Sequence, residues 1–507
     1  MAGLVGTTAT LPLDGRSLGW SEVETVHAGP VRVKLTSAAL SRVQSARRAV
    51  EAALARGDKV YGVNTGFGKL ADRIIAEEDS RVLQRNLVLS HAVGMGPRLP
   101  APETRLMMLF RINGLARGHS GCTAGMIDFI ATLLERGALP EIPEQGSVGA
   151  SGDLAPLAHL GILMLGETEP ARAELRRARL KPYVFKEKEG LCLINGTQFS
   201  LALLAASILK ADRLTRAADA IGAMTLEGLM GSVRPFDARL HEARPHRGQG
   251  IVAKNLRRLL RDSRIVEAHA QCLRIQDAYS LRCMPQVHGA AREVLDWVKA
   301  IALTEANSAS DNPLVFDSDG AILSGGNFHG MLLAHAADAL TAALTTLGNI
   351  SERRIESLTN PDVSGLPAFL SHEGGLNSGF MMLQVEAAAL AAENRTLCYP
   401  ACVSNIPTSA GKEDLVSMSP ISARHLRQVA ENLHTILTIE ALCAGQALDF
   451  RQPLRPGAGA RAGHASVRSV VKHCERDRYF KPEVEALRSH LTDRFLDDVT
   501  KEIGRLE

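Results

Sequence analysis

Apolar residues recur along most of this chain at the spacing of three and four residues that places them on one face of an α-helix. The stretch 36–56 shows the pattern most clearly, and Thr36 or Ser37 can cap its beginning. The same spacing returns in the segment that ends before Pro361 and in the stretch after Pro420. These patterns predict long helices in the middle and C-terminal parts of the chain.

Alanine occupies much of the remaining surface of these predicted helices, as in residues 385–394. Small side chains let neighbouring helices approach closely over long contacts, so the pattern predicts a helical bundle. Signals for β-strands are few and early, at residues 31–34 and 60–63. The sequence therefore predicts an all-α protein.

The chain shows no clear domain boundary. Its most irregular stretches, residues 166–189 and 450–465, do not separate regions of different composition. A repeat with a period of roughly 20 to 50 residues is also absent from the sequence. We expect a single domain over residues 1–507, with an N-terminal active-site lobe of loops and short helices over 1–120 and a helical bundle with C-terminal helices over 121–507.

Composition and charge narrow the possible partners. The 507 residues are 45% hydrophobic but include only 13 Phe, 5 Tyr and 2 Trp, so the core is mostly aliphatic. The 58 Lys and Arg residues nearly balance the 55 Asp and Glu residues, which leaves no basic surface for nucleic acid or anionic lipid. No run of about 18 uninterrupted apolar residues occurs, and residues 1–20 lack the features of a signal peptide. We expect a soluble, cytoplasmic protein that binds neither nucleic acid nor membranes.

The cysteines and histidines form no recognisable disulfide or metal pattern. None of the eight cysteines belongs to a CxxC pair, so reduced thiols are expected. The 16 histidines include no HExxH, and His329 and His335 are six residues apart, which does not place them on one helical face. The sequence therefore predicts no metal site.

The most unusual local sequence is the glycine-rich segment 146–154, GSVGASGDL, which precedes an apolar, helix-like stretch. One interpretation is a flexible loop in which Asp153 caps a helix that has Pro156 in its first turn. A phosphate-binding loop fits poorly, because the pattern GxxxxGK[ST] is absent and no strand clearly precedes the segment.

A third interpretation is that Ala150, Ser151 and Gly152 cyclise on themselves. If the amide nitrogen of Gly152 attacks the carbonyl carbon of Ala150, and the ring and Ser151 each lose water, the product is a methylidene-imidazolone. This group is a strong electrophile that needs no added cofactor. Gly152 supplies an unhindered nitrogen and Ser151 the leaving hydroxyl, while Gly149 permits a turn tight enough to press the reacting atoms together.

The segment GSVGASGDLAPLAH resembles the prosthetic-group segment of the histidine and aromatic amino acid ammonia-lyases, and the histidine branch is the nearest match. Seven further blocks follow the order of that family: YGVNTGFG at 61–68, LVLSH at 87–91, NGT at 195–197, QDAYSLR at 276–282, SDNP at 310–313, GGNFH at 325–329 and GLNSGF at 375–380. The resemblance implies the long helix bundle of the fumarase and ammonia-lyase type, and a homotetramer whose active sites are shared between subunits. It also implies 4-methylidene-imidazol-5-one as the prosthetic group, formed from Ala150, Ser151 and Gly152.

The resemblance assigns catalytic roles to residues outside the glycine-rich segment. Tyr61 matches the general base, and a phenol needs neighbouring positive charge or helix dipoles to act as one. Arg282 matches the group that pairs with the substrate carboxylate through two parallel hydrogen bonds. Asn195, Gln276 and Tyr279 match residues that hydrogen-bond the prosthetic group or the substrate, and Tyr279 is counted among the catalytic residues.

Three more residues match substrate-binding positions of the family. Phe328 matches a residue that lines the pocket beside the prosthetic ring, and His91 stands where the family sets its side-chain preference. Glu413 matches a carboxylate that contacts the substrate in the histidine branch, where the phenylalanine and tyrosine enzymes carry an amide. These matches favour a polar, imidazole-like substrate.

Four positions depart from the histidine-specific pattern. Met331 and Leu415 stand where a Glu and a His are usual, and Lys412 precedes Glu413 where a neutral residue is expected. Glu386 adds a carboxylate at a position that is normally uncharged. If Lys412 or Glu386 binds substrate, the charge pattern of that substrate differs from that of histidine; the alternative is that both lie on the surface.

These residues together predict a carbon–nitrogen lyase that eliminates ammonia from L-histidine and gives urocanate. One alternative is an ergothionase-like lyase that eliminates trimethylamine from ergothioneine to give thiourocanate, a reaction with little need of the imidazolone. A second alternative is a 2,3-aminomutase, which retains the ammonia and adds it back. A non-catalytic paralogue is disfavoured because Tyr61, Ser151 and Arg282 are all present.

Overall fold

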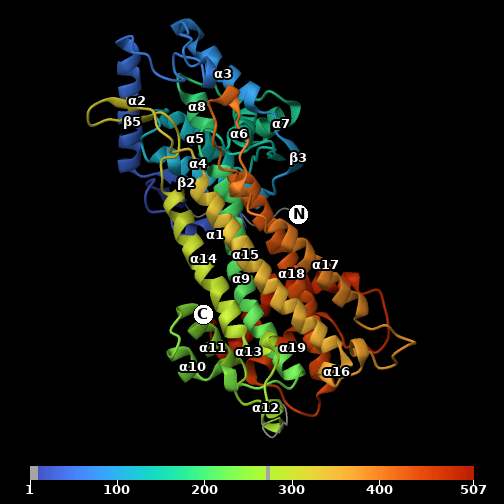
Figure 1. The fold of residues 1–507 in the computed structure, drawn as a ribbon. Helices are drawn as coiled ribbons and strands as arrows, with labels where there is room; N and C mark the ends of the chain where they lie inside the picture. Colours follow the sequence, from blue (N-terminus) through green and yellow to red (C-terminus); the bar gives the residue numbers. More distant parts are fainter. Residues whose placement is uncertain (1–9, 270–274) are drawn as a thin grey trace. The chain divides into compact units, whose positions relative to one another are not determined.

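The computed structural model describes residues 10–269 and 275–507 (Figure 1). Two earlier predictions fall on residues that are not described. Residues 1–9 belong to the stretch expected to lack a signal peptide, and Cys272 is one of the cysteines expected to be reduced. The chain forms two compact units, each made from three separate segments. Unit 1 comprises Met1–Ser207, Lys299–Asp338 and Pro400–Arg424, and unit 2 comprises Ile208–Val298, Ala339–Tyr399 and His425–Glu507.

Unit 1 contains short helices and small two-stranded sheets. Its helices are α1 (Trp20–Ala28), α2 (Ser37–Ala55), α3 (Ser80–His91), α4 (Ala101–Ala116), α5 (Ala124–Glu135), α6 (Leu154–Leu165), α7 (Glu169–Arg177) and α8 (Glu189–Ile194). The parallel pair is β1 (Thr10–Leu13) with β2 (Arg32–Leu35). The antiparallel pairs are β3 (Met95–Arg98) with β4 (Pro143–Gln145) and β5 (Leu314–Phe316) with β6 (Ala321–Leu323).

Four long helices contribute residues to both units: α9 (Gln198–Gly228), α14 (Met284–Ala306), α15 (Met331–Thr359) and α18 (Ser419–Phe450). The other α-helices of unit 2 are α10 (Ala238–Glu242), α11 (Arg247–Leu259), α12 (Arg264–Ala268), α13 (Tyr279–Arg282), α16 (Pro361–Ser364), α17 (Met381–Leu397), α19 (Ala458–Val470), α20 (Lys481–His490) and α21 (Leu496–Ile503). Short 3₁₀ helices are η1 (Gly68–Leu70), η2 (Glu77–Asp79), η3 (Arg234–Phe236), η4 (Ala368–Leu370), η5 (Ala401–Val403) and η6 (Ser409–Gly411), and η7 (Leu491–Phe495) is a π-helix.

The all-α class predicted from the sequence is confirmed, because helices dominate the described residues and the strands are few and short. The stretch 36–56 forms α2, and the hydroxyl of Thr36 caps it by accepting a hydrogen bond from the amide of Ala39 at 3.2 Å. Helix α15 ends at Thr359, just before the proline that was expected to end it.

The prediction of a strand at residues 60–63 is wrong, because these residues form a turn. Val60 and Val63 are buried, as a strand would require, but the amide of Val63 donates to the carbonyl of Val60 at 3.1 Å and closes a turn. The side chain of Asn64 accepts a hydrogen bond from the amide of Val60 at 2.8 Å. This local bond satisfies the backbone group that a neighbouring strand would otherwise pair with. The sequence-based prediction also misses β1, β3, β4, β5 and β6, each of which is only three or four residues long.

We expected a single domain over residues 1–507 with a division near residue 120, and this stays a prediction. The two units do not test it, because their segments alternate along the chain. Among the described residues, α15 is long and apolar enough to cross a membrane by length and composition, and more than half of its apolar window is buried. A single helix of this kind is a weak indication, since a buried core helix has the same properties.

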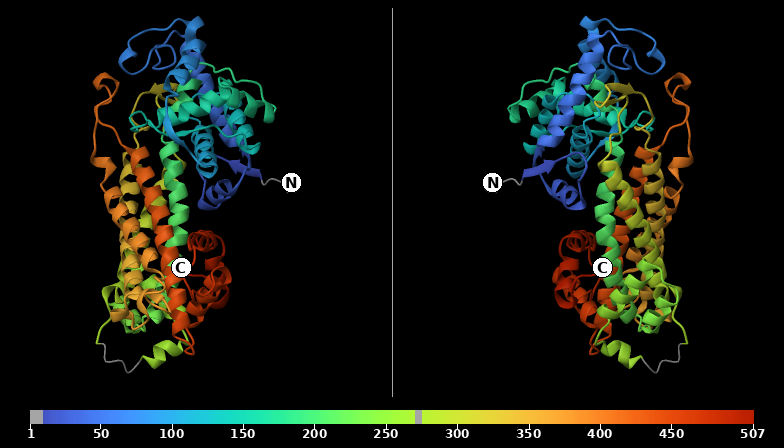
Figure 2. Two further views of the ribbon diagram at one scale, coloured as in Figure 1. Left: turned by 90° about the vertical axis from the view of Figure 1, so that its right-hand side faces the viewer. Right: turned by 90° about the vertical axis from the view of Figure 1, so that its left-hand side faces the viewer.

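In unit 2 the long helices lie side by side (Figures 1 and 2). A buried ion pair connects two of them. Arg354 of α15 donates from Nε and Nη2 to the carboxylate of Glu440 of α18, at 2.5 and 2.8 Å, and both side chains are fully buried. Thr225 of α9 and Ser351 donate their hydroxyls to the same carboxylate at 2.7 and 2.5 Å. The charge of Glu440 is therefore compensated and hydrogen-bonded on both oxygens.

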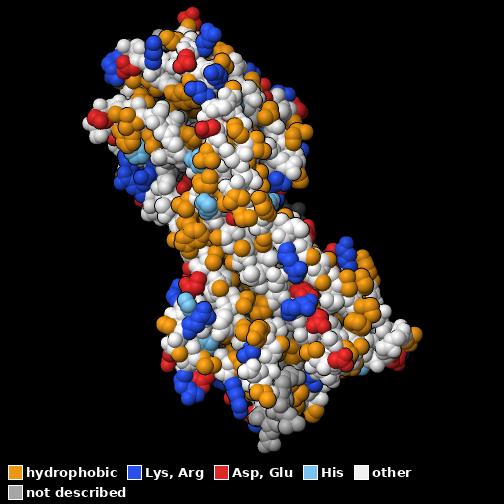
Figure 3. Space-filling model, viewed as in Figure 1, with side chains coloured by type: hydrophobic (Ala, Val, Ile, Leu, Met, Phe, Trp, Pro, Cys, Tyr) orange, Lys and Arg blue, Asp and Glu red, His pale blue; other side chains and the backbone are white. Residues whose placement is uncertain are grey.

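Helix α17 of unit 2 buries one stripe of small and apolar side chains and leaves another apolar stripe open. Leu383, Ala387 and Ala391 are buried, whereas Met382 is 67% and Val385 45% exposed. Hydrophobic side chains are visible on the surface over this helix (Figure 3). An exposed apolar stripe of this kind is typical of a surface that another protein chain covers.

Substituting Arg354 by Met should lower the free energy of unfolding by about 3–5 kcal/mol, because it leaves the carboxylate of Glu440 buried without its counter-charge. Urea unfolding followed by circular dichroism measures the change. The matched control is Arg264→Met, since Arg264 and its partner Glu267 are both exposed and this substitution should cost no more than about 1 kcal/mol. Equal losses in the two variants would contradict a specific role for the buried pair.

Candidate active site

The glycine-rich segment of unit 1 forms a tight turn between β4 and α6, pressed against a second backbone segment. Gly152 has a φ of +75° and forms an isolated bridge with Gly196. A Cβ atom at Gly152 would lie 2.7 Å from the carbonyl carbon of Gly196, so both the conformation and the space require glycine. The amide of Asp153 donates to the carbonyl of Gly196 at 2.7 Å. The turn and the segment that contains Gly196 therefore act as one structural element.

Asn195, which follows α8, holds the turn from the same segment. Its Nδ2 donates to the carbonyl of Ser151 at 2.9 Å, and its Oδ1 is buried without a hydrogen-bond partner among the described residues. The carbonyl of Asn195 accepts a 2.8 Å hydrogen bond from Nη1 of Arg111, an arginine of α4 that is fully buried. Because a buried guanidinium needs its acceptors, Arg111 fixes the backbone from which Asn195 reaches Ser151.

Asp153 precedes α6, but its side chain does not cap that helix. The carboxylate instead accepts hydrogen bonds from the amide and hydroxyl of Ser200 in α9, at 2.8 and 2.9 Å. Asp153 is fully buried, and this burial raises the pKa of its carboxyl to about 7 although the hydrogen bonds from Ser200 oppose the rise. The sequence-based interpretation of Asp153 as a helix cap is therefore wrong for its side chain.

A cavity of about 590 Å³ opens over this turn in unit 1. Five residues predicted for the site line it: Tyr61, His91, Ser151, Asn195 and Glu413. Lining residues that the sequence-based prediction does not name include Arg73, Asn86 and Ser409. The structure thus brings together residues from five separate parts of the sequence around Ser151.

Tyr61 reaches the cavity from a loop that is closed by its own hydrogen bond. The phenol oxygen of Tyr61 accepts from the amide of Gly68 at 3.1 Å, and the Tyr61 ring meets the edge of the Phe67 ring with 6.2 Å between centroids. A Cβ atom at Gly68 would lie 2.7 Å from the hydroxyl oxygen of Ser409. The glycine therefore allows the loop of Tyr61 to approach the segment of Ser409.

Glu413 contacts Ser151 directly at the edge of the cavity. The hydroxyl of Ser151 donates to Oε1 of Glu413 at 2.8 Å, and the hydroxyl of Thr408 donates to Oε2 at 2.6 Å. Both carboxylate oxygens are therefore engaged, one by the turn and one by the segment that carries Glu413.

His91 is the last residue of α3, and its ring is oriented by the helix. Its Nδ1 lies 2.8 Å from the carbonyl oxygen of Leu87 and 3.1 Å from the hydroxyl of Ser90. A carbonyl can only accept a hydrogen bond, so Nδ1 carries the proton, and Nε2 is the acceptor of the neutral ring.

The other predicted residues do not line this cavity. Ala150, Gly152, Phe328 and Lys412 belong to unit 1, and Lys412 is exposed. The remaining four residues, Gln276, Tyr279, Arg282 and Glu386, belong to unit 2.

Within unit 2, the guanidinium carbon of Arg282 lies 4.5 Å from the centroid of the Tyr279 ring, and Tyr279 is 69% exposed. Gln276 and Glu386 are also exposed. The predicted roles of all thirteen residues, whether or not they line the cavity, stay predictions.

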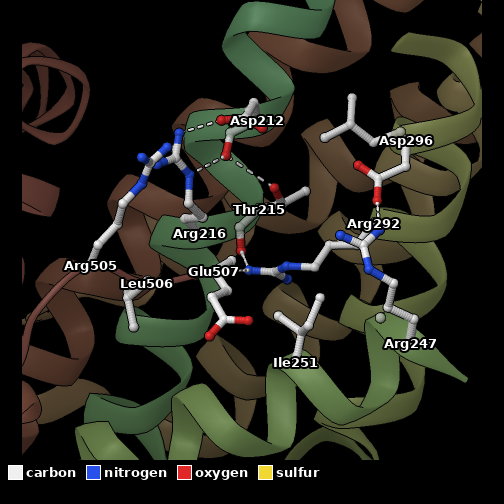
Figure 4. A pocket seen from close by; sticks show the side chains of 12 residues that line it. Asp212, Thr215, Arg216, Arg247, Ile251, Arg292, Asp296, Arg505, Leu506 and Glu507 are labelled. Atoms are coloured by element: carbon white, nitrogen blue, oxygen red, sulfur yellow. Dashed lines mark hydrogen bonds and ion pairs between the residues drawn. The ribbon is translucent and has the colours of Figure 1, made fainter. Parts of the chain in front are cut away.

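Unit 2 has its own pocket, of about 430 Å³, whose lining is dominated by ion pairs (Figure 4). Arg216 pairs with Asp212, and Arg247 pairs with Asp296 at 2.7 Å. The pocket contains no residue that the sequence predicts for the site. The cavity over the turn is therefore the candidate active site.

A sequence signal exists for only some of the residues that the prediction misses. Asn86 directly precedes the block 87–91, and Ser409 lies four residues before Glu413, so both stand beside recognised positions. Arg73 follows the block 61–68 but has no distinguishing neighbours. Within residues 10–269 and 275–507, no group of three or more His, Cys, Asp or Glu side chains could hold a metal ion.

Comparison with known proteins identifies the class of the chain. A family model described as aromatic amino acid lyase matches residues 18–469, and the chain belongs to that family. It is 50% identical to the histidine ammonia-lyase of Myxococcus xanthus (strain DK1622) over 489 residues, which cover 95% of this chain and 96% of that protein.

Two solved structures are closely similar to this one. The crystal structure of histidine ammonia-lyase from Trypanosoma cruzi matches with a TM-score of 0.90 and 40% identity, covering 98% of this chain and 96% of that chain. The structure of tyrosine aminomutase from Streptomyces globisporus matches with a TM-score of 0.93 and 35% identity, covering 98% and 100%. The fold is therefore common to lyases and aminomutases.

Replacing Asp153 by Asn should change how the stability of the protein depends on pH. In the unfolded chain the Asp153 carboxyl ionises near pH 3.9, whereas in the folded protein its pKa is raised to about 7. Between these values the folded state holds the extra proton, so the stability that this carboxyl contributes is lost as pH rises from about 4 to about 7. Asn cannot ionise and avoids this loss, which amounts to roughly 4 kcal/mol.

Urea unfolding of both proteins at several pH values from 5 to 8 measures the effect. The free energy of unfolding of the Asn variant should rise relative to the parent protein as pH increases to 7 and then stay level. The control is Asp317→Asn, because Asp317 is exposed, and its difference from the parent should not change with pH. A constant difference for Asp153→Asn as well would show that the carboxyl is already ionised at low pH.

Proposed function

We propose that this protein is an ammonia-lyase that converts L-histidine to urocanate and ammonia. The observation that carries the proposal is the single cavity in which Tyr61, His91 and Glu413 surround the hydroxyl of Ser151. The identity of 50% to a histidine ammonia-lyase over nearly the full chain supports histidine as the substrate over the alternatives.

The turn fits the formation of 4-methylidene-imidazol-5-one from Ala150, Ser151 and Gly152. Gly152 is held at a positive φ against Gly196, and no side chain could be accommodated there. Asn195 holds the Ser151 carbonyl in place. Ring closure needs the amide nitrogen of Gly152 close to the carbonyl carbon of Ala150, and a turn held from two sides favours that approach. Once formed, the group supplies an electrophile that turns the amine of the substrate into a better leaving group.

His91 and Glu413 offer acceptors for the N–H of a histidine side chain. The Nε2 atom of His91 accepts a hydrogen bond, because its Nδ1 donates to Leu87, and an imidazole N–H can supply that bond. Glu413 presents a carboxylate to the same cavity. A side chain without an N–H, such as that of phenylalanine, would leave Nε2 of His91 without a donor, which costs binding energy.

Tyr61 is placed to remove the β-proton of the substrate. Its phenol oxygen lies at the cavity and accepts a hydrogen bond from the amide of Gly68. A donor at this oxygen stabilises the negative charge that the base carries before it takes the proton. Tyr61 therefore acts as the general base in the proposed reaction.

The carboxylate of the substrate needs a cation, and Arg282 is the residue proposed to bind it. Arg282 lies in unit 2 beside the exposed ring of Tyr279, so these groups are available to a neighbouring chain. We place them, with Gln276 and Phe328, at active sites shared between the subunits of a homotetramer. The open apolar stripe of α17 (Figure 3) supports such an assembly.

The proposal also covers the cellular location of the protein and the charged residues Lys412 and Glu386. We propose a cytoplasmic location, supported by the free state of the seven cysteines that lie within the described residues, which is typical of a reducing compartment. Lys412 and Glu386 are exposed in the single chain, and a role for either in substrate binding depends on the assembled tetramer.

The purified protein should release urocanate from L-histidine and should absorb in the near ultraviolet because of the imidazolone. Ser151→Ala should lose both properties, since the alanine has no hydroxyl to eliminate. Urocanate absorbance measures the first property and the spectrum of the enzyme the second. If histidine yields nothing while ergothioneine yields thiourocanate and trimethylamine, the substrate assignment is wrong.

Tyr61→Phe should lower kcat by about 10²–10⁴-fold, the usual contribution of a general base, because the ring remains but the proton acceptor is gone. Steady-state kinetics with histidine measures the change. The matched control is Tyr183→Phe, since Tyr183 is the tyrosine of unit 1 that bonds Glu189 outside the cavity. A Tyr61→Phe enzyme with unchanged kcat would remove Tyr61 from the mechanism.

A further inference from the structure

The Ser151 hydroxyl has a specific partner that lies 262 residues away in the sequence. It donates to Oε1 of Glu413 at 2.8 Å, and both side chains are partly buried. Nothing in the local sequence of either residue produces this contact. It exists because two long segments of unit 1 are held together beside the cavity.

The Glu413 carboxylate is fixed on its own segment. Thr408 donates its hydroxyl to Oε2 at 2.6 Å, and its amide donates to the carbonyl of Glu413 at 2.9 Å. The two residues also form an isolated antiparallel bridge. With Oε2 occupied by Thr408, the oxygen left to face Ser151 is Oε1.

The segment that carries Glu413 is joined to the turn at two further points. The hydroxyl of Ser417 donates to the carbonyl of Gly149 at 3.0 Å, and the amide of Met418 donates to the carbonyl of Val148 at 2.9 Å. Val416 and Met418 are buried in one small apolar cluster, and Val148 and Ala150 pack against it. These contacts fix the distance between Glu413 and Ser151 independently of the hydrogen bond that joins them.

Ser151 is consequently held by two groups. Asn195 binds its carbonyl oxygen, and Glu413 binds its hydroxyl. The first contact orients the backbone that must close into a ring, and the second orients the group that must leave.

We infer that Glu413 has a role in the maturation of the turn, distinct from its role towards the substrate: it is the catalytic residue that binds and orients the Ser151 hydroxyl as that hydroxyl departs. This inference rests on the proposed function, since it requires that the imidazolone forms.

The chemistry of maturation explains why such a residue is needed. The nitrogen of Gly152 forms a bond to the carbonyl carbon of Ala150, and that carbonyl oxygen leaves as water with the protons of the two amide nitrogens. Ser151 then loses the proton on its Cα to solvent water, and the electron pair of that bond forms the double bond to Cβ. The Cβ–Oγ bond breaks with its electron pair on oxygen, and Oγ leaves as a second water with a proton returned from solvent.

The last bond to break is the difficult one, because hydroxide is a poor leaving group. A hydrogen-bond acceptor at Oγ holds the hydroxyl in one rotamer, which keeps the Cβ–Oγ bond aligned with the electron pair that displaces it. Glu413 is the side chain that contacts Oγ of Ser151 in the described residues.

The test compares Glu413→Gln with Glu413→Ala. The amide of Gln keeps a hydrogen-bonding group at the same length, so this variant should mature as the parent protein does while turning over histidine more slowly. Ala removes the contact, so maturation should be slower by roughly tenfold or more, the effect expected from losing one hydrogen bond to a charged group. Intact-mass spectrometry after short induction counts the chains that have lost the mass of two water molecules, and near-ultraviolet absorbance gives an independent measure.

Thr408→Val and Thr408→Ser keep the test valid if the loss of Glu413 disturbs folding. Val removes the donor to Oε2 and should slow maturation by a smaller factor than Glu413→Ala, whereas Ser keeps the donor and should restore the parent rate. Thr408 is in this sense a positioning residue, and the rescue by Ser separates that role from simple packing.

The outcomes distinguish this inference from the proposed function. The inferred role is wrong if Glu413→Ala matures at the parent rate. It is also wrong if the maturation defect of Glu413→Gln is as large as that of Glu413→Ala. Either result counts against the role even if the parent protein makes urocanate. If the parent protein matures normally but leaves histidine unchanged, the proposed function is wrong, and the comparison of the Gln and Ala variants still decides the role of Glu413 in maturation.

Discussion

The backbone of Gly152 lies against the backbone of Gly196, so closely that no side chain could stand between them. The rest of the site depends on this contact, because it holds the turn at 150–152 against the segment of Gly196 and beside Asn195. Arg111 stabilises this contact, because its buried guanidinium donates a hydrogen bond to the carbonyl of Asn195, the residue before Gly196. The protein thus holds a short segment in one conformation against a rigid backbone surface, which is fixed by a buried charge.

The cavity over the turn combines groups with opposite chemical tasks. Tyr61 offers an oxygen that can accept a proton, while His91 and Glu413 offer acceptors for the N–H of an imidazole. The loop of Tyr61 and the segment of Glu413 also approach one another, because Gly68 leaves room for Ser409. One cavity therefore serves two processes in our interpretation: the maturation of Ser151 and the later binding of substrate by the same carboxylate.

Much of this could be predicted from local sequence, although not all of it. The helix at 36–56 and the end of α15 follow from periodicity and from capping and proline effects within a few residues. The strand expected at 60–63 fails because Asn64 satisfies the backbone of Val60 locally, and an alternating apolar pattern contains no information about such a bond.

The sequence by itself determined the helical class, the family, and the identity of the residues in the turn, because each of these depends on residue types at short, regular spacings. Only the tertiary structure decided that Glu413 contacts Ser151 and that Asp153 binds Ser200 rather than capping its own helix. The physical reason is that such contacts join segments that are tens to hundreds of residues apart. Their geometry is set by how helices and loops pack, and this packing cannot be read from the spacing of residues along the chain.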